Sequence, residues 1–336
     1  MLDLLKKLCN TDGISGDEKS VREFIISEID GFCEWKTDNL GNIIAFKKGK
    51  NKPCRKVMLD AHMDEVGLII TNITSDGFLK FKTVGGIETS ALMFRRVKIN
   101  GEINGVICGK PVHLLSADEK KKAPKADSLY IDIGASTKKE AEEYITLGDC
   151  AVICGDYEEN EDYIISKAID DRIGCAVLMS LLKKESEYDF YASFSVQEEV
   201  GLRGAKVTAY SINPDSAIIL EGTTAADIAD VAESEQVCKL GSGVAVSFMD
   251  RATVYDREYY NAALNSGICC QPKAAVTGGN NSGAVHLSRE GVRTIALSVP
   301  CRYIHTSSSI ASKADCENLL KLAEYMLCGI CSGEIK

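Results

Sequence analysis

Strand-like and helix-like segments alternate along most of the chain, and residues 67–164 interrupt this alternation with short strand signals separated by Gly-rich turns. Alternating strands and helices are typical of a largely parallel sheet covered by helices, whereas short strands with tight turns are typical of an all-β domain. We therefore expect one α/β domain that is split in sequence, residues 1–66 and 165–336, around an inserted β domain, residues 67–164.

Apolar periodicity places the individual elements. Ser15 and Glu18 have the spacing of a capping box ahead of a helix that runs to Ile29, and Thr137 begins a short helix inside the β block. The other expected helices are 174–184, 258–264 and 314–329. The expected strands of the α/β domain are 42–46, 56–59, 190–196, 216–220, 244–248 and 294–298. Those of the inserted block are 67–73, 78–84, 96–99, 105–109, 129–134 and 151–155.

The charge and composition exclude several classes of partner. The net charge of −10 disfavours binding to nucleic acid or to an anionic membrane. The longest nearly apolar stretch, residues 174–182, is far shorter than the roughly 20 residues of a membrane span, and we see no signal peptide at the start of the chain. The 14 cysteines are scattered from Cys9 to Cys331, which favours reduced, mostly buried thiols. We expect a cytoplasmic protein.

Acidic and histidine side chains follow the carboxyl ends of the α/β strands. Open α/β sheets bind their ligands at this edge, so these groups are expected to meet in one crevice. Carboxylates that share a crevice repel one another, and protons or metal ions must offset their charge. The groups are His62, Asp64 and Glu65 after strand 56–59, Glu198 and Glu199 after 190–196, Glu221 after 216–220, His305 after 294–298, and Asp170 and Asp171 before helix 174–184.

These residue types match a two-metal centre. Carboxylate oxygens with one imidazole per ion suit Zn, Co or Mn, and a single carboxylate can bridge two ions about 3.5–4 Å apart. Of the four histidines in the chain, His62 and His305 sit at strand ends, whereas His113 lies in the β block and His286 elsewhere.

Competing chemistries have weaker support. The sequence contains no Gly-x-Ser-x-Gly elbow and no His-Glu-x-x-His motif. The Gly-rich stretch 278–283 lacks the Lys-Ser/Thr of a phosphate-binding loop, and no dinucleotide fingerprint follows a strand. We expect that stretch to line the crevice.

Four motifs, at residues 62–67, 167–174, 197–205 and 300–306, together resemble the tetrahedral aminopeptidases, also called glutamyl aminopeptidase or cellulase-M-like peptidases. The resemblance extends over nearly the whole chain. It implies a three-layer α/β/α metallopeptidase domain with a mixed sheet, interrupted by a β-barrel-like dimerisation domain. It also implies peptide substrates, and dimers that assemble into a hollow tetrahedral dodecamer.

The resemblance also implies a role for each candidate residue. Asp170 would bridge two divalent ions, Zn or Co with Mn as another option. His62 and Glu221 would complete one metal site, and Glu199 and His305 the other. Glu198 would be the general base and acid, Asp64 would orient His62, and Asp171 would shape its turn rather than bind metal.

Two segments depart from the family pattern. Asn280-Asn281-Ser282 stands where Thr-Asp-Ala is frequent, and Gly241-Ser242-Gly243-Val244 replaces a Gly-Lys-Gly-Pro pattern. These differences concern the specificity pocket more than the metal centre.

Three functions fit these observations. The first is a dinuclear metallo-aminopeptidase that releases N-terminal amino acids. The second is a related metallohydrolase that cleaves another amide, such as that of an N-acyl amino acid. The third is an inactive oligomeric binding protein that keeps the fold.

Overall fold

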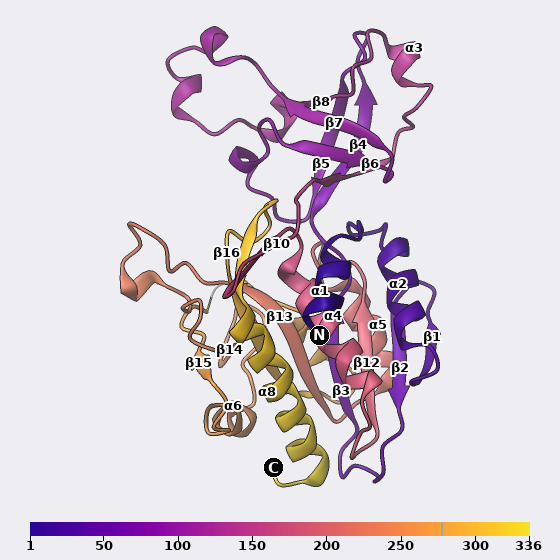
Figure 1. Cartoon of the computed structure of the whole chain (residues 1–336), viewed down its shortest axis with the longest axis vertical. Coiled ribbons are helices and arrows are strands. Elements are labelled where there is room, and N and C mark those ends of the chain that lie inside the picture. Colours follow the sequence, from indigo (N-terminus) through magenta and orange to yellow (C-terminus); the bar gives the residue numbers. More distant parts are fainter. Residues whose placement is uncertain (277) are drawn as a thin grey trace.

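The computed structural model describes residues 1–276 and 278–336, which form a large α/β body with a separate β-barrel above it (Figure 1). The mixed α/β fold with a separate closed barrel confirms the expected fold class.

Parallel strands form the centre of the large sheet. Hydrogen bonds join them in the order β12 (Phe190–Ser195), β3 (Val57–His62), β13 (Ser216–Thr224) and β16 (Arg293–Arg302). Every residue of β3 is buried, as expected for a central strand that is covered on both faces. The outer strands are β1 (Glu34–Thr37), β2 (Ile43–Lys47), β17 (Ser309–Ser312), β11 (Tyr163–Ser166), β10 (Glu158–Glu159), β14 (Val244–Val246) and β15 (Cys270–Pro272).

Helices cover both faces of this sheet. Helix α4 (Ile169–Lys183) lies against β3 and β13 and contacts α1 (Leu2–Cys9), α2 (Lys19–Ile29) and α8 (Lys313–Ser332). It is buried along most of its length because it lies between the sheet and these helices. The opposite face carries α5 (Arg203–Ile212) and α7 (Ser282–Val285), and α6 (Arg257–Leu264) packs beside α8, β14 and β15.

The inserted segment closes into a barrel with its own apolar core, centred on side chains such as Leu68, Val97 and Ile131. Helix α3 (Lys138–Ala141) begins at Thr137, whose hydroxyl accepts a hydrogen bond from the Glu140 N–H, as its capping spacing predicts. The barrel strands, in order, are β4 (Gly67–Ile73), β5 (Leu79–Val84), β8 (Tyr130–Asp132), β7 (Ile103–Cys108), β6 (Arg96–Ile99) and β9 (Cys150–Ile153).

Some local expectations were wrong. The capping box at Ser15 does not form, because the Ser15 hydroxyl donates to Asp64 and the Glu18 carboxylate accepts from the backbone of Gly16 and Gln197. The cysteines are all free, yet fewer are buried than expected: Cys54 and Cys269 are exposed and several others are half-buried.

A buried ionic cluster joins the two points where the chain crosses between the α/β body and the barrel. Glu65 lies just before β4, where the chain enters the barrel. The chain returns after β9, past Gly155, where an added Cβ would lie 3.2 Å from the Cβ of Lys167. The Lys167 ammonium donates to both Glu65 carboxylate oxygens at 2.6 and 2.9 Å, and Arg172 Nη2 donates to Glu65 Oε1 at 3.1 Å. The backbone N–H of Gly13 also donates to Glu65 Oε1. Glu65 therefore holds both crossings and the N-terminal loop in one arrangement.

Replacing Glu65 by Gln should destabilise the protein strongly, because the fully buried Arg172 would keep its charge without this carboxylate, whereas Lys167 would keep only its ion pair with Asp12 at 3.2 Å. We expect the free energy of unfolding to fall by about 3–5 kcal/mol in urea titrations. The matched control is Glu185→Gln, which breaks an exposed ion pair with Lys50 and should cost less than about 1 kcal/mol. Equal effects of the two substitutions would contradict the structural role of the cluster.

Candidate metal and active site

The acidic and histidine residues expected at the strand ends meet at one edge of the parallel sheet. His62 ends β3, Glu221 lies in β13, and Glu199 and His305 come from the segments that follow β12 and β16. Parallel neighbours deliver their carboxyl ends to the same edge, which explains why residues so distant in sequence become neighbours.

Asp170 lies between the two histidines. Its Oδ1 is 3.5 Å from His62 Nε2, and its Oδ2 is 3.5 Å from His305 Nε2. Glu221 Oε2 is 3.7 Å from His62 Nε2 on the first side, and Glu199 Oε1 is 3.2 Å from His305 Nε2 on the second. The two oxygens of one carboxylate therefore face two separate groups of ligand atoms.

Gly222 lets Asp170 approach β13 closely. Its backbone N–H donates to Asp170 Oδ1 at 3.2 Å, and a Cβ at this position would lie only 2.8 Å from the Cβ of Asp170. A larger residue would therefore push Asp170 away from the two histidines.

Asp64 is fully buried and organises the neighbouring Glu198–Glu199 turn. Its carboxylate accepts hydrogen bonds from the backbone N–H groups of Glu198 and Glu199 at 3.0 and 3.1 Å, and from the Ser15 hydroxyl. The His62 Nδ1 atom is 2.9 Å from the Asp64 backbone carbonyl and 3.5 Å from its carboxylate. Asp64 thus contacts both the histidine and the pair of glutamates.

The inserted barrel contributes directly to the site. His305 Nδ1 is 2.8 Å from the backbone carbonyl of Gly86, in the segment that follows β5. With Nδ1 facing that carbonyl, Nε2 is directed at Asp170 and Glu199.

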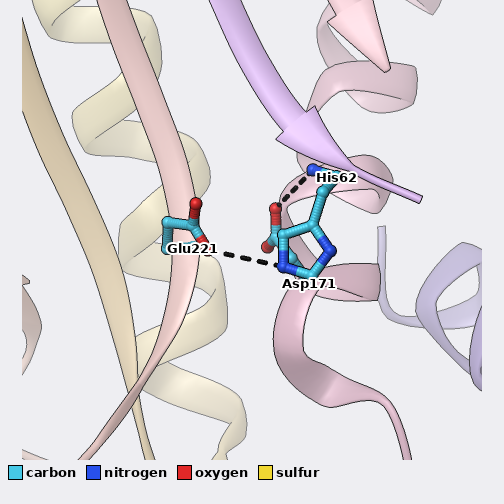
Figure 2. A group of neighbouring side chains, drawn as sticks. All are labelled: His62, Asp171 and Glu221. Atoms are coloured by element: carbon cyan, nitrogen blue, oxygen red, sulfur yellow. Dashed lines mark hydrogen bonds and ion pairs between the residues drawn. The ribbon is translucent and has the colours of Figure 1, made fainter. Parts of the chain in front are cut away.

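Asp171 lies in the same cluster, and Figure 2 shows it beside His62 and Glu221. Both of its oxygens accept backbone hydrogen bonds, one from His62 and one from Gly174. Burial holds the pKa of Asp171 well above its ordinary value. These contacts shape the turn and leave Asp171 less available to a ligand than Asp170.

The cluster has the donors that a divalent metal ion requires. His62, Asp170 and Glu199 offer ligand atoms within 4.8 Å of one another, and so do His62, Asp171 and Glu221. The Oε1 atoms of Glu199 and Glu221 are buried and accept no hydrogen bond from the described residues, although Glu199 Oε1 lies 3.2 Å from His305 Nε2. A cation would satisfy both, so the residues fit a metal centre.

The pKa values of the side chains in the cluster reflect the close approach of several carboxyl groups. Burial opposes the charge of His305, but Asp170 and Glu199 raise its pKa to about 11. Burial, together with Glu199 and Asp170, raises the pKa of Glu198 to about 8 despite the opposing influence of His62. Protons thus offset the charge that metal ions would otherwise offset.

A cavity of about 250 Å³ opens beside the cluster. Glu198 and Asn280 both line it, and the Gly-rich stretch contributes Gly278 and Gly279, as expected. Asn281 is instead buried behind the wall, where its amide donates to Asp60 at 2.7 Å and to Ser195 at 2.9 Å.

Several residues of the site have no local signal in the sequence. Gly86 and Lys167 act through contacts between segments more than 100 residues apart, so spacing alone does not reveal their roles. Glu65 was expected in the crevice, but its carboxylate binds Lys167 and Arg172 instead. The clearest omission is Lys273 in the cavity wall, which follows a short strand that the apolar pattern does not predict.

The fold and the cluster together are of the kind found in metal-dependent hydrolases, with acidic and histidine side chains gathered at the edge of a mixed sheet. Residues 41–322 match the family model described as M42 glutamyl aminopeptidase, and the chain belongs to this family of metal-dependent aminopeptidases. This confirms the resemblance read from the four motifs.

Individual relatives agree with this assignment. The chain is 40% identical to an Acetivibrio thermocellus protein with a provisional aminopeptidase name, over 98% of both chains. It is 32% identical to lysyl aminopeptidase of Pyrococcus furiosus, over 97% of this chain and 96% of that one. Among solved structures, the chain is similar to the Pyrococcus horikoshii TET1 peptidase, with a TM-score of 0.84 and 34% sequence identity. The match covers 97% of this chain and 98% of that one. The TET1 peptidase can assemble into a tetrahedron or a large octahedral shell. Within the described part of the chain, no helix has the length and apolar character needed to cross a membrane.

Metal loading should release protons, because an imidazole must lose its proton before it binds a metal ion. The pKa of His305 is about 11 in the metal-free protein, so protons compete with metal at every lower pH. The apparent affinity for Zn²⁺ should therefore fall as the pH falls, about tenfold per pH unit for each proton displaced.

Calorimetry of Zn²⁺ binding in buffers with different protonation enthalpies measures this proton release. His305→Ala should release fewer protons, whereas the control His113→Ala, an exposed position in the barrel, should not change the number. A binding enthalpy that is independent of the buffer would contradict the prediction.

Proposed function

We propose that the chain is a dinuclear metallo-aminopeptidase that hydrolyses the first peptide bond of peptides with a free N-terminus. The observation that carries this proposal is the position of Asp170, whose two carboxylate oxygens face His62 and His305 on opposite sides. This is the arrangement required of a carboxylate that bridges two cations.

The same side chains would hold two divalent ions, with Zn or Co favoured and Mn as another option. Asp170 would be shared, His62 and Glu221 would complete one site, and Glu199 and His305 the other. When bound, the ions polarise the scissile carbonyl and lower the pKa of a water molecule.

Glu198 is the proposed general base and general acid. It lines the cavity beside the cluster, and a carboxyl group in this position can accept a proton and return it. One Glu198 oxygen takes the proton of the water that attacks the peptide carbonyl. The same carboxyl then gives this proton to the departing amide nitrogen, so that no net proton is consumed. Asp64 supports this step through its hydrogen bonds to the Glu198 and Glu199 backbone.

The acidic wall of the cavity favours substrates with a free N-terminus. Of the acids that line it, Glu198 is not a proposed metal ligand, so its carboxyl group is available to face an N-terminal ammonium, which carries the complementary charge. An N-acyl amino acid lacks this charge. The alternative functions, deacylation or binding without hydrolysis, are therefore less well supported.

Glu198→Gln should keep the metal ions and lose roughly 10²- to 10⁴-fold in kcat, because glutamine can neither accept nor return the proton. Turnover of aminoacyl fluorogenic substrates measures the rate, and elemental analysis of the purified variant measures the metal content. Chelation of the wild-type protein should abolish turnover, and Co, Zn or Mn should restore it.

Three results would contradict the proposed function. They are near-normal turnover by the glutamine variant, full activity after chelation, and hydrolysis of acylated but not free-amine substrates. The exposed control Glu185→Gln should leave both rate and metal content unchanged.

We further propose that the chain forms a homo-oligomer of dimers, arranged as a tetrahedral dodecamer, through the barrel. The barrel segment exposes large apolar side chains, which mark interfaces when they gather on a surface. They are Phe94, Val112, Leu114, Tyr144 and Leu147. The structural similarity to the self-assembling TET1 peptidase supports the same conclusion.

Analytical ultracentrifugation should therefore give a mass many times the 36.4 kDa of one chain. Phe94→Asp should shift the distribution to smaller species, because a buried charge at an interface is costly. A single-chain mass for the wild-type protein would refute the assembly, and Tyr210→Asp, at an exposed position on α5, provides the control.

A further inference from the structure

The turn that carries Glu198 and Glu199 is held from two sides. Asp64 accepts hydrogen bonds from their two backbone N–H groups, at 3.0 and 3.1 Å. The preceding N–H, that of Gln197, donates to the carboxylate of Glu18 at 3.1 Å, and Glu18 is 179 residues away in sequence. Three successive N–H groups of one turn thus bind buried carboxylates that come from other segments of the chain.

Glu18 does not use its side chain for the helix that it precedes. It is the N-cap residue of α2, a position where the side chain commonly accepts from the first turn. Its carboxylate accepts from no N–H of that turn, all of whose residues the structure describes. Instead Glu18 Oε1 accepts from the backbone of Gly16 at 2.7 Å and of Gln197 at 3.1 Å. The residue is only 4% exposed, so water cannot easily replace these contacts.

Gln197 has a backbone conformation that needs such support. Its φ is +56°, in the left-handed region, which is costly for a residue with a side chain. Its carbonyl is fixed on the other side, because it accepts from the Arg203 N–H at the start of α5. Without an acceptor for its N–H, Gln197 could relax to a negative φ, and the peptide that leads to Glu198 would rotate.

We propose that Glu18 is a positioning residue for the general base, because it fixes the backbone of Gln197 and thereby the direction of the Glu198 side chain. This inference rests on the proposed aminopeptidase function, in which Glu198 transfers the proton. The described residues that line the cavity do not include Glu18, so its effect reaches the reaction only through the turn. A displacement of about 1 Å at a reacting group can lower the rate roughly 100-fold.

The contact requires an acceptor oxygen at the right distance rather than a charge. Both hydrogen bonds use the same oxygen of Glu18, and the amide oxygen of a glutamine could take its place. An aspartate keeps the charge but is one methylene shorter, so its oxygens fall short of Gln197. Aspartate is also a favoured N-cap residue, so Glu18→Asp is expected to keep α2 and to fold.

Kinetics with aminoacyl fluorogenic substrates at saturating Zn²⁺ test this role. We expect Glu18→Asp to lower kcat roughly 10- to 100-fold with little change in KM, because the base is misplaced while substrate binding is kept. Glu18→Gln should keep most of the wild-type kcat. The matched control is Glu23→Asp, since Glu23 lies exposed on the same helix and forms an exposed ion pair with Lys19 at 3.8 Å. This control should change neither constant.

Hydrogen exchange of the metal-free proteins measures the turn directly. The peptide segment that contains Gln197 and Glu198 should exchange faster in Glu18→Asp than in the wild type, and at the wild-type rate in Glu18→Gln. A wild-type kcat in Glu18→Asp would overturn the assignment. An equal loss of kcat in Glu18→Gln, or a fall in kcat without faster exchange, would overturn it as well.

The exchange measurement also separates this inference from the proposed function. If the wild-type protein hydrolyses no amide, but the turn exchanges faster in Glu18→Asp and not in Glu18→Gln, the aminopeptidase proposal fails and the contact between Glu18 and the turn stands. If the wild-type protein hydrolyses amides and Glu18→Asp changes neither kcat nor exchange, the positioning role fails alone.

Discussion

Two adjacent buried carboxylates, Asp64 and Glu65, hold the parts of the site together. Successive side chains of an extended segment point in opposite directions, so the two acids serve different neighbours. Asp64 accepts from the Glu198 and Glu199 backbone, and Glu65 binds Lys167, just ahead of the segment that presents Asp170. A cluster of like charges would otherwise spread apart, and these contacts hold it in place in the metal-free protein. The short turn after β3 thus determines where two other strand ends can lie.

The inserted barrel is part of this arrangement rather than an attachment to it. The chain leaves and re-enters the α/β body beside the Glu65–Lys167 pair, and the Gly86 carbonyl of the barrel side contacts His305 Nδ1. Each body therefore orients one candidate metal ligand. Asp64 of the α/β body orients His62, and Gly86 of the barrel side orients His305. A relative movement of the two bodies would change the direction of the His305 ring. Assembly through the barrel would restrict that movement and so hold His305 in position, which joins quaternary structure to the geometry of the site.

Much of the fold and the outline of the site could be predicted from sequence, for identifiable physical reasons. Central parallel strands are continuous apolar runs, and their carboxyl ends point to one edge, so His62, Glu199 and Glu221 could be placed together before their distances were known. Ser15 shows where local reasoning fails, because its capping spacing competes with a buried partner, Asp64, that is close only in three dimensions. Lys273 could not be recognised for a related reason. A lysine next to a proline after a short strand is usually exposed, and only the packing of β14 and β15 buries it.

The charge balance of the cavity connects the metal centre to the choice of substrate. Without metal, Asp170, Glu198, Glu199 and Glu221 would repel an acidic side chain, and the raised pKa values of Glu198 and His305 show how strongly the protein resists that concentration of negative charge. Two divalent cations would offset these four carboxylates, so the field beyond the ligands would be set by the next charged group in the wall. That group is Lys273, buried where its attraction is weakly screened by solvent. The charge that the cavity presents to a substrate would therefore depend on metal loading as well as on this lysine.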